Sequence, residues 1–190
     1  MNGTRAGSAL VLCLAVGFGV GCGSQNEVST GEGPAVTQGV SGALDYDGVG
    51  EAKQGMTLEL VTGLFGEPAE IDRVAGCELD SEAGDSQVAT WNVDEGTITL
   101  TFDADDERLV GYSTDSPSLE TVDGARVGDS FGELSDTTGG PALEPLDLGV
   151  AATPEQGVWF REQDDDSKLT FDIAESEIKR ILGGFNPVCE

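Results

Sequence analysis

The chain has 190 residues, which allows one compact domain or two small ones. Nine Lys and Arg against thirty-six Asp and Glu give a formal net charge of −27, and histidine is absent. This balance argues against nucleic-acid binding and against docking on anionic lipid headgroups, since both need cations. Without histidine, Ser-His-Asp and Cys-His catalysis and His-ligated metal sites are excluded. The acidity is explained by solubility or by a high-salt habitat, with steering of a cationic partner as a third explanation.

Residues 1–21 are predicted to form a secretory signal peptide. Arg5 precedes a run of apolar residues and glycines from Ala9 to Val20, and small residues follow. A basic start, a short apolar stretch and a small-residue end are typical of such peptides. A membrane-spanning helix is the less favoured alternative, because the stretch between Arg5 and Cys22 has only sixteen residues, short of the roughly 20 that a bilayer crossing needs.

The end of this segment, "GVGC" from Gly19 to Cys22, resembles the lipobox of prokaryotic lipoproteins. In that family a small residue precedes a cysteine that is lipidated and becomes the new N-terminus. Gly21 and Cys22 match, whereas Gly19 stands where leucine is usual. The resemblance implies lipidation at Cys22, which would anchor an exported domain to the cell membrane through that lipid alone, outside the cytoplasm. Stable anchoring needs more than one acyl chain. Simple secretion is the alternative.

Residues 22–44 are predicted to be a flexible tether after the lipidated cysteine. They are rich in Gly, Ser, Thr and Gln and have no hydrophobic periodicity. Such a composition is typical of a linker that behaves as a random coil.

Two cysteines remain for the folded part of the chain. Cys13 leaves with the signal peptide and Cys22 is committed to lipid, so that Cys77 and Cys189 are left. Disulfides persist in the compartments that exported proteins occupy. We therefore predict a Cys77–Cys189 disulfide, with two unpaired buried thiols as the alternative.

Two segments with the same layout lie 73 residues apart, "AKQGMTLELVTGLFGEP" at 52–68 and "ARVGDSFGELSDTTGGP" at 125–141. Each predicts a short amphipathic helix that a glycine and then a proline terminate. Thr57 is the expected N-cap of the first helix and Ser130 that of the second. Glu133 stands three residues after Ser130, which predicts a capping box.

Strand-like segments follow each predicted helix. They are residues 87–93, 97–103 and 108–113 in the first copy, and residues 157–162, 168–173 and 177–184 in the second. Trp91 and Trp159 stand at matching positions, where we expect both to lie in the core. We interpret the pattern as an internal duplication, with repeats at 45–118 and 119–190 that pack together or merge into one sheet. A chance likeness of two capped helices, each before a hairpin, is the alternative.

The fold class predicted from this order is α+β, with two tandem copies of a helix followed by an antiparallel β-sheet. Each copy has only about seventy residues, too few to bury a generous core alone.

The chain shows few signs of catalytic chemistry. It has no Gly-rich phosphate loop and no Cys-x-x-Cys motif. Two acidic clusters, "DADDE" at 103–107 and "EQDDD" at 162–166, are predicted to be solvated turns between strands. Calcium binding is the alternative, although neither has the glycine and terminal glutamate of an EF-hand loop. A carboxylate pair could also serve a hydrolase, but no two can be singled out. We therefore predict no catalytic residue, metal ligand or cofactor.

One further pattern resembles the repeat of β-lactamase inhibitory proteins and of the small lipoproteins of the outer-membrane β-barrel assembly machine. The residues that carry the match are Gly55, Met56, Thr57, Val61 and Gly66 in the first copy, and Gly128, Ser130, Leu134 and Gly139 in the second. The second copy lacks the Met-Thr pair. The resemblance implies an α+β tandem module that binds proteins through its sheet and has no catalytic centre.

These observations together lead us to expect a lipid-anchored, non-enzymatic binding module of the cell envelope. Its partner is expected to be a protein, for which a cationic surface is one possibility, and not a nucleic acid. An envelope hydrolase that uses carboxylates and a calcium-binding protein with acidic turns are the alternatives.

Overall fold

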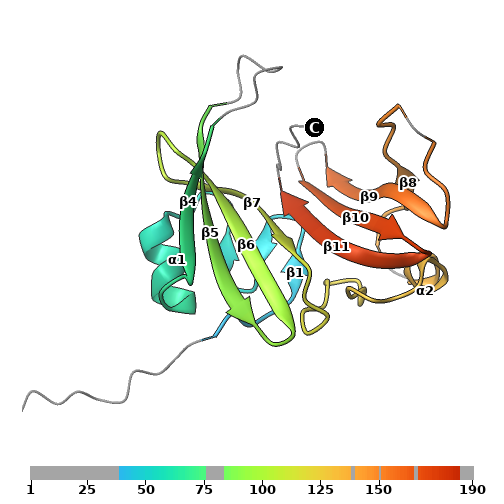
Figure 1. Ribbon diagram of the computed structural model, residues 1–190, viewed down its shortest axis with the longest axis horizontal. Helices are drawn as coiled ribbons and strands as arrows, with labels where there is room; N and C mark the ends of the chain where they lie inside the picture. The colour runs from blue at the N-terminus through green and yellow to red at the C-terminus, as the bar shows by residue number, and fades with distance from the viewer. Residues whose placement is uncertain (1–38, 76–83, 138–139, 150, 165–166, 185–190) are drawn as a thin grey trace, which may run out of the picture. The chain divides into compact units, whose positions relative to one another are not determined.

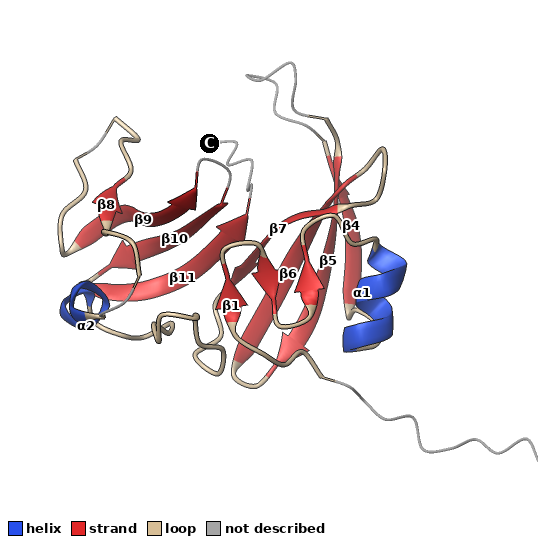
Figure 2. Cartoon of the chain, turned by 180° about the vertical axis from the view of Figure 1, so that it is seen from behind, coloured by secondary structure: helices blue, strands red, loops and turns tan. Residues whose placement is uncertain are grey.

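A computed structural model describes residues 39–75, 84–137, 140–149, 151–164 and 167–184. Within these ranges the chain forms eleven strands and two short helices. The strands make one sheet of three strands and one of eight, which Figures 1 and 2 show from opposite sides.

The smaller sheet consists of three two-residue antiparallel strands. They are β1 (Leu44–Asp45), β2 (Gly48–Val49) and β3 (Ala52–Lys53). Lys53 Nζ donates to the carboxylates of Asp45 and Asp47 at 2.9 and 2.7 Å. These bonds join β3 to β1 and to the turn between β1 and β2. The Tyr112 hydroxyl donates to the carbonyl oxygen of Asp45 at 2.7 Å and so fixes this sheet against the larger one.

The larger sheet is antiparallel throughout, in the order β4-β5-β6-β7-β11-β10-β9-β8. Its strands are β4 (Glu70–Val74), β5 (Ser86–Val93), β6 (Gly96–Asp103), β7 (Leu109–Thr114), β8 (Glu144–Pro145), β9 (Gln156–Asp164), β10 (Ser167–Ala174) and β11 (Glu177–Gly184). The last strands of the two halves, β7 and β11, pair at the centre, and each half continues outward from there in reverse chain order. All six strands predicted from the sequence are confirmed within two residues at their ends.

Helix α1 (Leu58–Phe65) begins and ends where the sequence predicts. The Thr57 side chain accepts the N–H of Leu60, and the helix closes at Gly66, whose φ of 83° lies in the left-handed region that favours glycine. Both predicted helix ends are confirmed.

Helix α2 (Phe131–Asp136) has the predicted capping box. The Ser130 side chain accepts from the Glu133 N–H, and the Glu133 carboxylate accepts from the Ser130 N–H. The helix ends at Asp136, and Gly139, the predicted stop, lies outside the described residues.

The hydrophobic core lies on one face of the eight-stranded sheet. Alternate residues of the strands are buried there, as the period of two requires. On β6 and β10 these are Ile98, Leu100, Phe102, Leu169, Phe171 and Ile173. Both helices and the three-stranded sheet pack against this face, through Val61, Phe65, Leu134, Leu44 and Val49. Two aromatic pairs join helices to strands, Phe65 with Trp91 and Phe131 with Trp159.

The predicted α+β fold class, two tandem helix-and-sheet units, is wrong, because the protein is β-rich. The helices have only eight and six residues. The two sets of strands merge into one sheet through the β7–β11 pairing. Five strands were not predicted from the sequence: β4 and β8 extend this sheet at its edges, and β1 to β3 form the separate small sheet.

The two halves make the same backbone contacts just before each helix begins. The Gly55 N–H donates to the Leu109 carbonyl at 2.8 Å, and the Gly128 N–H donates to the Ile178 carbonyl at 2.8 Å. The N-cap residues each form an antiparallel bridge to the start of the last strand, Thr57 with Arg108 and Ser130 with Glu177.

Candidate functional site

The face of the large sheet opposite the core, which we call the open face, carries a row of uncharged side chains. Six residues lie directly opposite one another across six neighbouring strands, from β5 to β9. In order they are Thr90, Thr99, Ser113, Leu182, Thr170 and Phe160, and we call them the uncharged row. Five of the six are half-buried, and Leu182 at the centre is 8% exposed. The row is therefore a continuous band across the sheet.

Hydroxyl groups dominate the first half of this row. Thr90 and Thr99 stand opposite each other, and their Oγ1 atoms lie 3.2 Å apart. Thr97 and Thr101 flank Thr99 on the same face of β6, because alternate residues of a strand share a face. Asp103 is the one charged residue of β5, β6 and β7, in a chain that carries −27 overall. This half of the open face therefore offers methyl and hydroxyl groups and almost no charge.

The second half of the row contains its two apolar residues, Leu182 and Phe160, and lies between two ion pairs. Lys168 pairs with Glu162 at 3.3 Å on one side of it, and Arg180 pairs with Asp172 at 3.2 Å on the other. Lys168 Nζ also lies 5.3 Å from the centre of the Phe160 ring, within the range of a cation–π contact. The charges beside the row thus neutralise each other locally.

A glutamate continues the row at each edge of the sheet. Glu70 of β4 lies opposite Thr90, and Glu144 of β8 lies opposite Phe160. Both residues are exposed. The open face consequently has an uncharged centre and an acidic edge at each end.

Beneath the row, on the core face, a buried polar cluster holds β9 in place. Arg161 is 2% exposed and donates to the Asp123 carboxylate at 3.2 Å and to the Leu134 carbonyl at 2.7 Å. It also bonds to the Thr137 hydroxyl. The Tyr46 hydroxyl donates to the same Asp123 carboxylate at 3.0 Å. Because Arg161 follows Phe160 directly, this cluster also fixes where the end of the row lies.

The pKa of Tyr46 is shifted by burial and by the neighbouring Asp123 carboxylate. Desolvation and the hydrogen bond to Asp123 both raise the pKa of Tyr46 well above its usual value, since each disfavours the phenolate. Burial likewise raises the pKa of Tyr112.

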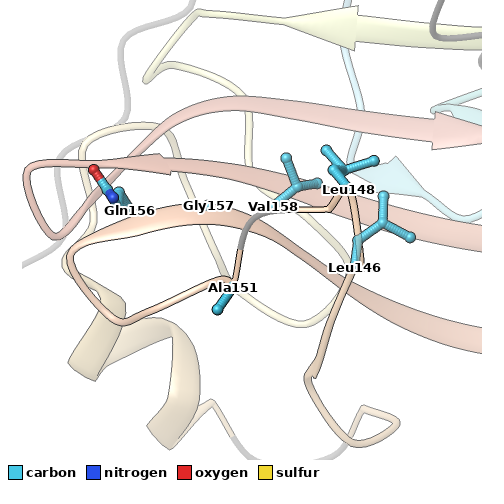
Figure 3. A pocket seen from close by; sticks show the side chains of 6 residues that line it. All are labelled: Leu146, Leu148, Ala151, Gln156, Gly157 and Val158. Carbon is cyan, nitrogen blue, oxygen red and sulfur yellow. The ribbon is translucent and has the colours of Figure 1, made fainter.

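A shallow apolar pocket of about 310 Å³ adjoins the row at the β8–β9 corner. Leu146, Leu148, Ala151, Gln156, Gly157 and Val158 line it (Figure 3). Val158 lies two residues before Phe160 on the same face of β9.

The three cysteines that the sequence singled out, Cys22, Cys77 and Cys189, all lie outside the described residues. The lipid site and the disulfide therefore stay predictions.

The first acidic cluster, 103–107, forms a turn between β6 and β7, as predicted. Asp103 accepts the N–H groups of Asp105 and Asp106, and Arg108 pairs with Asp106 at 3.3 Å. The second cluster connects β9 and β10, but residues 165–166 fall outside the described part. Nowhere in the described ranges do three or more Cys, Asp or Glu residues gather closely enough to hold a metal ion.

The tryptophans lie on the core side, as expected. Trp91 is 3% exposed and donates from Nε1 to the Gly66 carbonyl at 2.9 Å. Trp159 is half-buried and packs against the core beside Phe131.

The uncharged row was not predicted from the sequence. Its one visible signal is "TITLT" at 97–101, in which threonines alternate with apolar residues and so predict a hydroxyl-bearing face. The rest depends on which strands pair.

No protein-family model and no curated protein matches this sequence. Among solved structures, an extracellular protein containing a SCP domain from Bacillus anthracis str. Ames is similar with a TM-score of 0.42 and 10% identity. The match covers 67% of this chain and 42% of that one. A likeness at this level does not indicate a shared fold or function. In the part of the chain that the structure describes, no helix is long and apolar enough to span a membrane.

Proposed function

We propose that this chain is a non-enzymatic binding module of the cell envelope, whose protein partner docks on the open face of the large sheet. The observation that carries the proposal is the uncharged row. The centres of protein interfaces are depleted of charged residues, whereas their rims are polar. An uncharged band across six strands, with a glutamate at each end, has this arrangement.

The acidity of the chain supports a protein partner of a particular kind. A net charge of −27 repels other acidic surfaces and steers basic ones toward the molecule. The partner surface that fits has an apolar centre facing Leu182 and Phe160 and basic groups facing Glu70 and Glu144.

We further propose that the module is exported and held at the membrane by lipid on Cys22. The support is the sequence pattern at residues 1–22, a signal-like segment that ends in "GVGC". The chain between Cys22 and the folded residues would then tether the domain to the lipid. The tether predicted at 22–44 is too long at its end, because Val40 packs against the core and Leu44 lies in β1 and is fully buried.

The division into two repeats, 45–118 and 119–190, is likewise a proposal. The shared hydrogen bonds of Gly55 and Gly128 and the mirrored strand order around the β7–β11 pair support it.

Docking on the open face can be tested by site-directed crosslinking in the cells that make the protein. The photoreactive residue benzoylphenylalanine would replace Thr99 or Ser113 on the open face, or Leu60 on α1 as a control. Leu60 is 60% exposed and belongs to a helix on the core face. We expect one partner to crosslink from Thr99 and from Ser113 but not from Leu60.

The crosslinked partner, identified by mass spectrometry and purified, then allows a binding measurement. Thr99→Glu places a charge within the row and should weaken binding at least tenfold. Thr99→Ser keeps the hydroxyl and should leave binding within twofold. Equal crosslinking from Leu60, or unchanged binding by Thr99→Glu, would show that the partner docks elsewhere.

A further inference from the structure

The pocket at the β8–β9 corner is built by a loop that folds closely onto β9. The Leu146 N–H donates to the Val158 carbonyl at 2.8 Å, which continues the β8–β9 pairing by one residue. Gly157 has a φ of 128°, and a side chain there would meet Ala152 at 2.7 Å. Glycine at this position thus allows the loop to approach β9. Figure 3 shows the side chains of Leu146, Leu148 and Val158 gathered on one side of the pocket.

Leucine and valine side chains give this pocket an apolar lining that water reaches. Leu148 is 45% exposed, which makes it one of five large apolar residues that are exposed in the described chain. Leaving this area in water costs free energy, which an apolar group seated in the pocket would recover. The volume of about 310 Å³ lies at the small end of the range for ligand sites and fits one large side chain.

The segment that builds the pocket carries charges of one sign only, while across the sheet Asp172 lies opposite Val158 and is paired with Arg180 at 3.2 Å. Between residues 127 and 160 the chain has no Lys or Arg, and its charged residues there are Asp129, Glu133, Asp136, Glu144, Asp147 and Glu155. Glu144, Asp147 and Glu155 stand within three residues of the lining side chains and are exposed. An acidic ligand such as a fatty acid is therefore repelled, while a cationic one is attracted.

We propose that this pocket takes one large apolar side chain from a partner segment in which Lys or Arg residues flank that side chain. The inference rests on the proposed function and adds the class of segment that the partner presents. Apolar contact in the pocket supplies an anchor at one end of the uncharged row, and the surrounding carboxylates select the flanking cations.

Three synthetic peptides, acetylated and amidated, test this proposal against the full chain labelled with ¹⁵N. Their sequences are Lys-Lys-Leu-Lys-Lys, Lys-Lys-Ser-Lys-Lys and Glu-Glu-Leu-Glu-Glu. We expect the first to shift the amide resonances of Leu146, Leu148 and Val158 on titration. The serine peptide should bind at least fivefold more weakly, and the glutamate peptide should cause no shift at these residues.

Two matched variants separate the pocket from general charge attraction. Leu148→Lys places a positive charge at the pocket mouth, which repels the lysines of the lysine–leucine peptide, and should weaken binding of that peptide at least tenfold. Leu60→Lys adds the same charge at another exposed leucine, on α1, and should change binding less than twofold. Equal binding of the leucine and serine peptides, or equal losses in the two variants, would overturn the proposal.

The peptide titration and the binding test with Thr99→Glu can contradict the two proposals separately. If the peptide binds at Leu148 but Thr99→Glu leaves the partner bound, the pocket stands and docking on the open face is wrong. If Thr99→Glu releases the partner but the peptides do not distinguish leucine from serine, the open face stands and the pocket proposal is wrong.

Discussion

Arg161 and Asp123 form an ion pair that is almost sealed from water: Arg161 Nη1 lies 3.2 Å from Asp123 Oδ2, and the side chains are 2% and 12% exposed. Asp123 also accepts from Tyr46, and Arg161 also donates to the Leu134 carbonyl in α2. One ion pair thus joins the loop before α2, the helix itself and strand β9.

We predict that Asp123→Asn destabilises the protein strongly, because it leaves the Arg161 guanidinium buried without a counter-charge. Removing one partner of a buried pair costs about 3–5 kcal/mol in free energy of unfolding. Arg161→Met should cost less, since it removes the buried charge itself, and the double variant should be more stable than Asp123→Asn alone. Urea denaturation of the three variants measures this.

The exposed pair of Arg180 and Asp172 serves as the control for that series. Its side chains are 53% and 36% exposed, and Arg180→Met should change the free energy of unfolding by less than about 1 kcal/mol. If Asp123→Asn costs no more than this control, the buried pair does not hold β9 to α2.

Alkaline pH should destabilise the protein through Tyr46, Tyr112 and Lys53. Their pKa values are raised in the folded state, by burial for the tyrosines and by the Asp47 and Asp45 carboxylates, against burial, for Lys53. The unfolded chain therefore loses these protons first, so stability is fully present below pH ~10 and falls as the pH rises above it. The urea midpoint between pH 8 and 11.5 measures the loss. Tyr46→Phe should flatten part of this dependence, and an unchanged slope would contradict the assignment.

We predict that added NaCl raises the melting temperature. Most exposed charges are negative, and their repulsion opposes the folded state. The Debye length falls from about 10 Å at 0.1 M salt to about 3 Å at 1 M, which screens this repulsion. A variant with Glu51, Glu67 and Glu155 changed to Gln should gain less from salt than the wild type.

Calcium binding by the acidic turns would give a different result when the melting temperature is measured. If the melting temperature is flat in NaCl but rises with micromolar CaCl₂, the acidic turns at 103–107 and 162–166 bind metal. Surface repulsion would then not explain the effect of the charge.

Mass spectrometry of the non-reduced mature protein should find Cys77 and Cys189 in one linked peptide pair. The bridge would close a loop of more than a hundred residues, worth about 4–5 kcal/mol in the chain-entropy model. Cys77→Ser should therefore lower the melting temperature, and a reducing agent should lower that of the wild type to the same value. Free thiols at both positions under oxidising conditions would refute the bridge.

Cells that make the protein should incorporate labelled palmitate into it, and Cys22→Ala should abolish the label. The reason is that the lipobox cysteine is the acceptor of the lipid in the family that "GVGC" resembles. Secretion of an unlabelled wild-type protein into the medium would show that the chain is not anchored.

Local signals were sufficient to predict both ends of α1, the start of α2 and six strands. Thr57, Ser130 and Glu133 cap helices through contacts within three residues, and Leu100 and Phe171 alternate with polar neighbours on their own strands. Strand β4, with the sequence "EIDRV", was missed, because all five of its residues are exposed and edge strands carry little apolar pattern.

The open face could not be predicted, because it depends on pairs of residues that are distant in the chain. Ser113 lies opposite Leu182 only because β7 pairs with β11, and no local pattern specifies that pairing. Arg161 could not be placed from the sequence either, because a charged residue usually indicates a solvent-facing position. It is buried here because Asp123 and the Leu134 carbonyl accept its hydrogen bonds.

The β7–β11 pairing also bears on how the molecule folds as it is made. The first half is made first, and until the second half follows, β7 ends the sheet with a row of unpaired backbone groups. If β11 of another molecule reaches that edge sooner, the result is a domain-swapped dimer with the same hydrogen bonds. The yield of monomer is then governed by how fast the second half is delivered, and not by the strength of the pairing itself.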